Sequence, residues 1–439
     1  MSLISAQKSN IKNYFNFLLA LMPLSFIAGN LIINYNIIIL ILSTIVIYKK
    51  EVFKQQYFFL DKIIILFFTF ILIFGPINDI MAFINDAPQK DFTTTLKSFL
   101  FLKYLFLYFS VRFLVEKKII YIKFFFISSC FCSVFVCFDI FYQFIYGKDI
   151  FGYEIVGNGR RLSGPFGDEL IAGGYIQRFS IFSFFLIPLF YNHYSRSLLK
   201  YFLPLIFLIF FTGLILSGNR MPMILFIFTV FLIFVFHKQV RKYLLYFVII
   251  FSIIFSSFYN FSSNVKRSSN NFYGQISKMV TIIINKDFDN KNSPQYFKEF
   301  SSFYETWLLN KYTGGGIKSF RYHCHLRKNI PEDSSFICNM HPHNYYLEIL
   351  TELGAFGFAI VLILLYNVLH ISFFKKYFSK STLKENNIII PFIFLLIVEI
   401  FPLKSTGSFF TTGNTTYFFL LISILVGLIR EHNSIENKN

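Results

Sequence analysis

The chain has 439 residues, of which 55% are hydrophobic and 65 are phenylalanine, and its mean hydropathy is +0.57. A water-soluble core cannot bury so much apolar side chain, so a soluble globular protein is excluded and an all-α integral membrane protein is predicted. The balance of 41 basic against 23 acidic residues gives a net charge of +18. This excess does not indicate nucleic-acid binding, because much of it falls in short clusters between apolar runs, where it sets membrane topology.

Apolar runs follow one another along the whole chain and predict about twelve membrane-spanning helices. The spans are expected at 14–31, 33–48, 62–77, 96–115, 119–146, 171–191, 201–217, 221–236, 244–260, 345–369, 388–403 and 415–430. The first run follows Lys8 and Lys12 and leads at once into the second without a small-residue cleavage site, which favours an uncleaved span over a signal peptide. Three regions result, namely N-terminal spans at 1–130, a second membrane region at 131–430 and a short tail at 431–439.

Short basic clusters between the spans predict the orientation. One side is expected to hold both termini and the clusters at 49–54, 117–123, 196–200, 238–242 and 375–384. Because lysine and arginine collect in cytoplasmic loops, this side is expected to be cytoplasmic. The polar segment at 261–344, between the ninth and tenth spans, then forms one long outer loop. Its own basic charge carries little weight, since loops longer than about 60 residues do not decide orientation.

The end of this outer loop carries the strongest candidate for an active site. His341, His343 and Asn344 lie where polar loop becomes apolar helix, and in a helical continuation Asn344, Glu348 and Glu352 share one face. A helix N-terminus suits an anion and keeps a nearby histidine neutral, hence able to accept a proton. We therefore expect His343 to be catalytic, although a lone histidine is more often structural, and His341 to be a solvated neighbour.

Two earlier outer motifs present arginines. Arg160 and Arg161 precede Gly164 and Pro165, which allow a tight re-entrant turn, and planar guanidinium groups suit phosphate. The alternative is an interfacial loop that binds lipid headgroups. In the second motif, the short turn from Ser217 to Pro222, Arg220 is either an anion clamp or an interface anchor.

A third motif, Gly314-Gly315-Gly316, precedes Arg321. It is not a Walker loop, because Ile317 breaks the glycine–lysine sequence, so it predicts either a flexible turn presenting Arg321 or a structural turn alone. Within the spans, Arg178 and Glu399 need partners, since a lone charge in the membrane is costly. Glu399 is expected to meet Lys404, or Arg178 lines a cavity below the Arg161 loop.

Two cysteines in the outer loop, Cys324 and Cys338, are candidates for a disulfide. A bridge closing a loop of about 15 residues contributes up to roughly 3 kcal/mol and requires an oxidising compartment. The competing interpretation is a zinc site that adds the neighbouring histidines. It would use His323, His325, His341 and His343, but the spacing matches no structural zinc pattern.

These motifs, taken in order and separated by spans, resemble the O-antigen ligase family over residues 130–425. The elements that carry the resemblance are Arg161-x-Ser163-Gly164-x-Phe166, Ser217-Gly218-Asn219-Arg220, Gly315-x-x-x-x-Phe320-Arg321 and His343-Asn344-x-x-Leu347-Glu348 with Glu352-x-Gly354. One element departs from the family pattern. After Phe166 many relatives carry an Asn-Pro-Asn-like segment, where this chain has Asp168-Glu169-Leu170.

The resemblance implies a glycosyltransferase in the bacterial inner membrane. It would move a glycan from undecaprenyl diphosphate to lipid A-core on the periplasmic face, with Arg161, Arg220, Arg321 and His343 carrying the site. The family also includes O-antigen polymerases and protein O-oligosaccharyltransferases, which share the donor. The expected partners are therefore the lipid-linked donor, a glycan or protein acceptor and the bilayer.

A mechanism follows from the residues. Arg220 and Arg321, with Arg161, would bind the diphosphate, while neutral His343 takes the acceptor proton and Glu348 or Asn344 orients it. Arg160 and Arg178 are further candidates for substrate binding. We expect inversion at the anomeric carbon and no cofactor or metal, since no Asp-x-Asp motif lies on the outer side. A transporter of lipid-linked sugars is the alternative from another class, but no internal repeat is evident.

Overall fold

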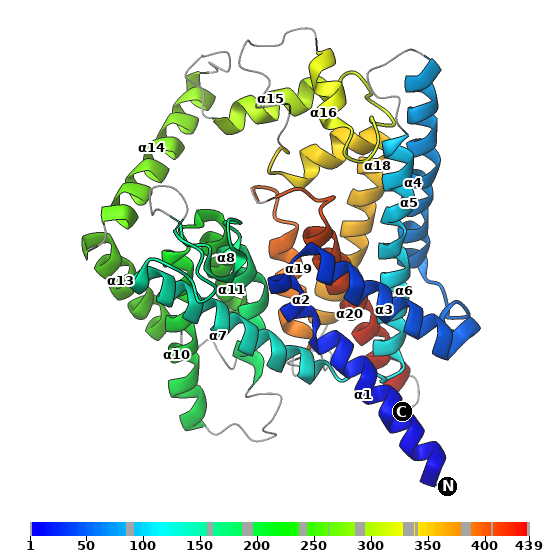
Figure 1. Cartoon of the computed structure of the whole chain (residues 1–439), viewed down its shortest axis with the longest axis horizontal. Helices are drawn as coiled ribbons and strands as arrows, with labels where there is room; N and C mark the ends of the chain where they lie inside the picture. Colours follow the sequence, from blue (N-terminus) through cyan, green and yellow to red (C-terminus); the bar gives the residue numbers. More distant parts are fainter. Residues whose placement is uncertain are drawn as a thin grey trace.

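The structure, a computed structural model, describes residues 2–84, 92–155, 161–186, 196–236, 244–261, 263–285, 295–327, 338, 341–378, 388–404 and 407–436. Arg160 lies outside them. Within this part the chain is helical, and no strand is present apart from an isolated bridge between Lys148 and Glu154 (Figure 1). The longer helices are α1 (Ser2–Ala20), α2 (Met22–Ala28), α3 (Asn30–Tyr48), α4 (Phe59–Ile84), α5 (Thr93–Phe101), α6 (Lys103–Glu116), α7 (Ile122–Tyr146), α8 (Ala172–Phe179), α10 (Arg196–Leu216), α11 (Arg220–Phe236), α13 (Leu244–Phe261), α14 (Ser263–Asn285), α15 (Gln295–Trp307), α18 (Tyr345–Leu369), α19 (Ile389–Glu399) and α20 (Thr412–Glu436).

Seven helical stretches of the described part are long and apolar enough to cross a membrane. They are Ser9–Ala28, Asn30–Val52, Phe59–Ile84, Thr93–Glu116, Ile122–Tyr146, Tyr345–Phe374 and Thr412–Glu431. Four shorter apolar helices lie at Tyr201–Leu216, Arg220–Phe236, Val248–Phe261 and Ile389–Glu399. The all-helical, multi-pass class predicted from the sequence is confirmed, whereas the number of twelve spans stays a prediction.

The segment expected as one outer loop contains helices of its own. α14 and α15 lie within 261–344, followed by the single turn α16 (Phe320–His323), and they form an arch over one end of the molecule (Figure 1). The low average hydropathy of α14 conceals its helical pattern, because its apolar side chains lie on one face and its polar side chains on the other. Figure 1 also places both chain ends on the side away from α15 and α16. The membrane side of each end remains a prediction.

A buried ion cluster explains the polar residues in three of the apolar helices. Asp61 of α4 accepts hydrogen bonds from Arg112 of α6 (Nη1 to Oδ1, 2.5 Å), from the Tyr108 hydroxyl (2.6 Å) and from Arg430 of α20. Glu116 lies 3.7 Å from Arg112 and 3.6 Å from Arg430. The C-terminal helix is thereby tied to the first half of the chain, along the α6 face on which it packs.

Candidate active site

The start of α18 is fixed by Asn344. Its backbone is extended (φ −140°, ψ 121°), and its Oδ1 accepts the amide hydrogens of Tyr346 (3.0 Å) and Leu347 (3.2 Å). Its Nδ2 donates to the carbonyl of Pro402 (2.7 Å). These are the bonds of an N-cap, and they satisfy donors that a helix start otherwise leaves unpaired. The side chain predicted to contact substrate is thus occupied in holding the helix to the segment after α19.

Nearly three turns later α18 is interrupted at Gly354, and the glycine motif fills the gap. Gly354 has φ 65° and ψ −172°, a conformation that essentially only glycine adopts. The amide of Gly316 donates to the Glu352 carbonyl (2.8 Å), and the amides of Ala355 and Phe356 donate to the carbonyls of Lys311 (2.8 Å) and Tyr312 (3.0 Å). The motif is therefore a structural insert that replaces the missing helical hydrogen bonds, and it carries Lys318 and Arg321 to the same place.

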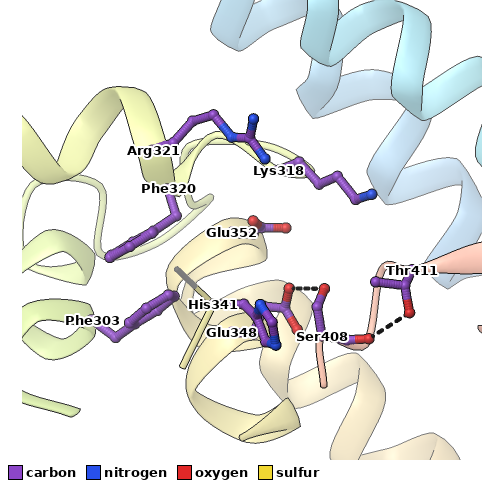
Figure 2. A pocket seen from close by; sticks show the side chains of 9 residues that line it. All are labelled: Phe303, Lys318, Phe320, Arg321, His341, Glu348, Glu352, Ser408 and Thr411. Atoms are coloured by element: carbon purple, nitrogen blue, oxygen red, sulfur yellow. Dashed lines mark hydrogen bonds between the residues drawn. The ribbon is translucent and has the colours of Figure 1, made fainter. Parts of the chain in front are cut away.

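A pocket of about 120 Å³ lies where these elements meet (Figure 2). Its walls combine cations, carboxylates, hydroxyls and an aromatic pair. The lining residues are Phe303, Lys318, Phe320, Arg321, His341, Glu348, Glu352, Ser408 and Thr411. The helical spacing predicted for Glu348 and Glu352 brings both into this pocket, together with Arg321.

The two glutamates differ in how they are held. Glu348 accepts hydrogen bonds from the Ser408 hydroxyl and from the amide of Phe409 (2.5 Å), so it fastens the 407–411 loop to α18. Glu352 is only 2% exposed, and its Oε2 has no hydrogen-bond partner among the described residues. One carboxylate is thus occupied in the fold and the other has a buried oxygen left over.

Lys318 and Arg321 supply positive charge beside the pocket. Within the described part of the chain neither side chain makes a hydrogen bond or an ion pair, and Arg321 is exposed. Figure 2 shows both above the Glu352 carboxylate. Lys318 has a left-handed backbone (φ 58°), which a sequence motif does not reveal. Lys318 interacts electrostatically with Glu348 and Glu352, and Arg321 adds a second positive charge. Two cations over a cavity suit an anionic ligand such as a phosphate.

The two histidines lie together, but not as predicted. His341, expected as a solvated neighbour, is half-buried and lines the pocket, because the chain turns at His343 with φ 49°. The two imidazole centroids are 4.3 Å apart. Burial lowers the pKa of His343, and burial together with the charges of His343 and Lys318 lowers the pKa of His341 to about 4. Both rings are therefore neutral at neutral pH, and each can accept a proton.

A second charged cluster lies beside the pocket. Glu399 pairs with Arg178 of α8 (2.8 Å) and with Lys404 (2.5 Å), as expected for Glu399 and Lys404. Arg178 also donates to Asn414 (2.7 Å), and Asn414 donates to the Ser408 carbonyl (2.6 Å). The cluster is therefore joined to the pocket through the loop that Glu348 holds. Burial lowers the pKa of Lys404 to about 7 against the opposing effect of Glu399.

The second arginine motif contacts the segment that follows the first one. Asn219 accepts from the amide of Gly173 (3.2 Å) and donates to the Leu170 carbonyl (3.3 Å), so the Ser217–Arg220 turn packs on the start of α8. Arg161 and Arg220 are half-buried and are not among the residues that line the pocket. Their predicted role in binding diphosphate stays a prediction.

Cys324 and Cys338 form a disulfide with a Cα–Cα distance of 5.4 Å. It packs against the stacked rings of Phe303 and Phe320, which form one wall of the pocket. Both thiols of the alternative zinc site are used in this bond. Among the described residues no three histidine, cysteine or acidic side chains come together as a metal site.

Sequence reasoning missed Lys318, Ser408 and Thr411. Ser408 and Thr411 lie about 60 residues beyond Glu348 in a run of small polar residues between α19 and α20. That run could have indicated them, because polar side chains between two membrane-spanning helices need hydrogen-bond partners and are therefore candidates for lining a polar site.

Comparison with known families gives one match. Residues 205–362 match the family described as O-antigen ligase. The matched segment contains Arg220, Arg321, His343 and both glutamates of α18, while Arg161 and Arg178 precede it. A comparison with curated proteins finds no matching sequence.

Proposed function

We propose that this protein transfers an O-antigen-like glycan from undecaprenyl diphosphate to lipid A-core. The match of residues 205–362 to the O-antigen ligase family supports a role in glycosyl transfer. The reaction takes place at the periplasmic face of the bacterial inner membrane, with both chain termini in the cytoplasm. The observation that carries this proposal is the pocket at the start of α18. It brings Lys318 and Arg321 together with His341, and His343 lies beside His341; both histidines are neutral at neutral pH.

The chemistry needs these two kinds of group. The acceptor hydroxyl oxygen bonds to the anomeric carbon as the bond from that carbon to the diphosphate oxygen breaks, so the configuration inverts. Undecaprenyl diphosphate leaves with the bonding electrons, and Arg321 with Lys318 stabilises its developing negative charge. The hydroxyl proton passes to neutral His343.

Other residues act around this centre. Arg220, with Arg161 and Arg160, extends the binding of the diphosphate, because planar guanidinium groups bind phosphate oxygens in pairs. Arg178 supports the donor side through Glu399 and Asn414. Asn344 and Glu348, whose hydrogen bonds are taken by the protein, orient the site by holding α18 and the 407–411 loop.

Reconstitution tests the proposal. The purified protein would be given an undecaprenyl diphosphate glycan and, separately, lipid A-core, a second carrier-linked glycan and a serine-containing periplasmic protein. Product on lipid A-core alone is the expected result. Product on the second glycan or on the protein alone would make the chain a polymerase or a protein O-oligosaccharyltransferase.

Two further results would contradict the proposal in different ways. Movement of the carrier lipid between leaflets without any product would indicate a transporter. Activity is expected to survive a chelator, because no step uses a metal or another cofactor. Loss that one added divalent ion restores would contradict the metal-free mechanism.

A further inference from the structure

Glu352 is a buried carboxyl group that accepts a hydrogen bond from the backbone amide of Lys318 but has one oxygen, Oε2, that the fold leaves unused. It is 2% exposed, its Oε2 has no partner among the described residues, and its side chain lines the pocket. A buried polar atom without a partner costs about 1–3 kcal/mol, so native structures keep few of them. Such an atom facing a cavity points to a ligand that supplies the missing bond.

Glu348, one turn earlier in α18, is a buried glutamate whose role is structural, and it serves as a comparison for Glu352. Glu348 is equally buried, but its two oxygens take the Ser408 hydroxyl and the Phe409 amide. Both side chains leave the same face of α18 and reach the same pocket. The two glutamates differ in their hydrogen bonds. Both carboxyl oxygens of Glu348 have a partner, whereas Oε2 of Glu352 has none among the described residues.

The pocket lining indicates which chemical group of a ligand can form a hydrogen bond with Glu352. A carboxyl oxygen accepts hydrogen bonds and a protonated carboxyl also donates one, so a hydroxyl group, which can do both, is a suitable partner. Lys318 and Arg321 lie above Glu352 and suit the phosphate part of the ligand (Figure 2). Phe303 and Phe320 form the apolar wall beside them. A sugar phosphate matches these three features, because it combines hydroxyl groups, an apolar ring face and a neighbouring phosphate.

We propose that Glu352 binds a hydroxyl group of the sugar attached directly to the diphosphate of the lipid-linked donor. This inference rests on the proposed function for the identity of the donor. The first sugar bears the diphosphate on its anomeric carbon, so its hydroxyl groups lie on the same ring, close to the phosphate that the cations hold. The pocket is thus the subsite for the sugar whose anomeric carbon reacts, and Glu352 discriminates sugars by the position of that hydroxyl.

Binding of two carriers to detergent-solubilised full-length protein tests this inference without an acceptor. One carrier is the undecaprenyl diphosphate glycan, and the other is undecaprenyl diphosphate without sugar. For Glu352→Met we expect binding of the sugar-bearing carrier to weaken about 10-fold, as for a lost hydrogen bond to a buried group, with no loss for the sugarless carrier. The thermal unfolding midpoint should change little, because the Lys318 amide loses its acceptor while an unpartnered buried atom is removed.

Matched variants separate this role from general damage. Glu348→Met removes two satisfied bonds and should lower the unfolding midpoint. Arg321→Gln should weaken both carriers alike. Should Glu352→Met fail to fold, Glu352→Gln, nearly the same in shape, is measured in the same way with the same expected loss.

The outcomes distinguish this inference from the proposed function. Unchanged preference for the sugar-bearing carrier in the folded Glu352 variants would overturn the sugar subsite, even if the wild-type protein transfers glycan. Selective loss of that preference supports the subsite, even if no acceptor gives product and the proposed transfer fails. A wild-type protein that binds both carriers equally would also overturn the subsite.

Discussion

His343 lies next to a second histidine, and this geometry decides how its role can be tested. The rings of His341 and His343 are 4.3 Å apart, and His341 is the one that lines the pocket. For His343→Ala we expect normal folding and a loss of transfer of about 100-fold or more, the scale of a lost general base. The measurement is initial rate in proteoliposomes, and His325→Ala, an exposed histidine of the same segment, serves as control. A near-normal rate for His343→Ala with a 100-fold loss for His341→Ala would assign the base to His341.

The pH dependence follows from the direction of the pKa shifts. Burial lowers the pKa of His343 below the ordinary value of 6.5, so the neutral form persists as the pH falls through that value. The base is lost only where the pH falls below the lowered pKa. We therefore expect the acid limb of kcat/KM that reports this base to lie below pH 6.5. An acid limb centred at or above pH 6.5 would contradict a buried histidine base.

At the level of single residues, the sequence indicated part of the site. Arg321, His343, Glu348 and the Glu399–Lys404 pair come from motif spacing and from the cost of lone charges in a membrane. Lys318 and His341 could not be predicted, because their places depend on left-handed backbone at positions 318 and 343. A lysine and a histidine are uncommon in that conformation, and only the packed structure imposes it.

At the scale of the helices, the interruption of α18 at Gly354 leads to a specific prediction. A Cβ added at Gly354 would lie 2.4 Å from the Tyr312 carbonyl, at a φ of 65°. For Gly354→Ala we expect a destabilisation of about 2 kcal/mol or more, with loss of transfer, since both the helix gap and the inserted loop are disturbed. The measurement is the thermal unfolding midpoint together with the transfer rate.

The matched control is another glycine inside a helix. Nothing lies within 4 Å of a Cβ added at Gly274 of α14, and its backbone is helical. Gly274→Ala should be neutral or stabilising by about 0.5–1 kcal/mol, the usual preference for alanine in a helix. Equal effects at the two positions would show that the inserted loop contributes nothing to stability.

Periodicity and hydropathy predicted most of the helices but not this interruption. The apolar run at 345–369 reads as one continuous span, and a single glycine within it is tolerated in many helices. The break arises from a loop about 40 residues earlier that supplies the replacement hydrogen bonds. No local pattern encodes such a partnership between distant backbone segments.

For the molecule as a whole, the buried cluster around Asp61 connects the first and last parts of the chain. Asp61 bonds two buried arginines, one of them on the C-terminal helix. For Asp61→Asn we expect a destabilisation of about 3–5 kcal/mol, because two buried cations lose their closest anion. Thermal unfolding in detergent would measure it.

An exposed pair provides the comparison for this variant. Lys148 and Glu154 are 3.2 Å apart, and both side chains are largely in solvent. Glu154→Gln should change the unfolding midpoint little, as surface pairs contribute about 0–1 kcal/mol. A small effect for Asp61→Asn would mean that α20 is held by its apolar packing alone.

At this scale, composition alone predicted the all-helical membrane class, because hydrocarbon solvent requires every backbone group to be bonded within a helix. The helices at 263–285 and 295–307 could not be predicted from average hydropathy, since polar residues cover one side of each.

The loop that fills the gap in α18 has a consequence for the life of the protein in the cell. Docking of the 311–316 segment and completion of α18 are one event, because each supplies the other's hydrogen bonds. A newly made chain in which the 311–316 segment has not yet docked therefore has no formed pocket. The site appears only when both segments are in place, so a half-folded copy cannot carry a partly assembled site.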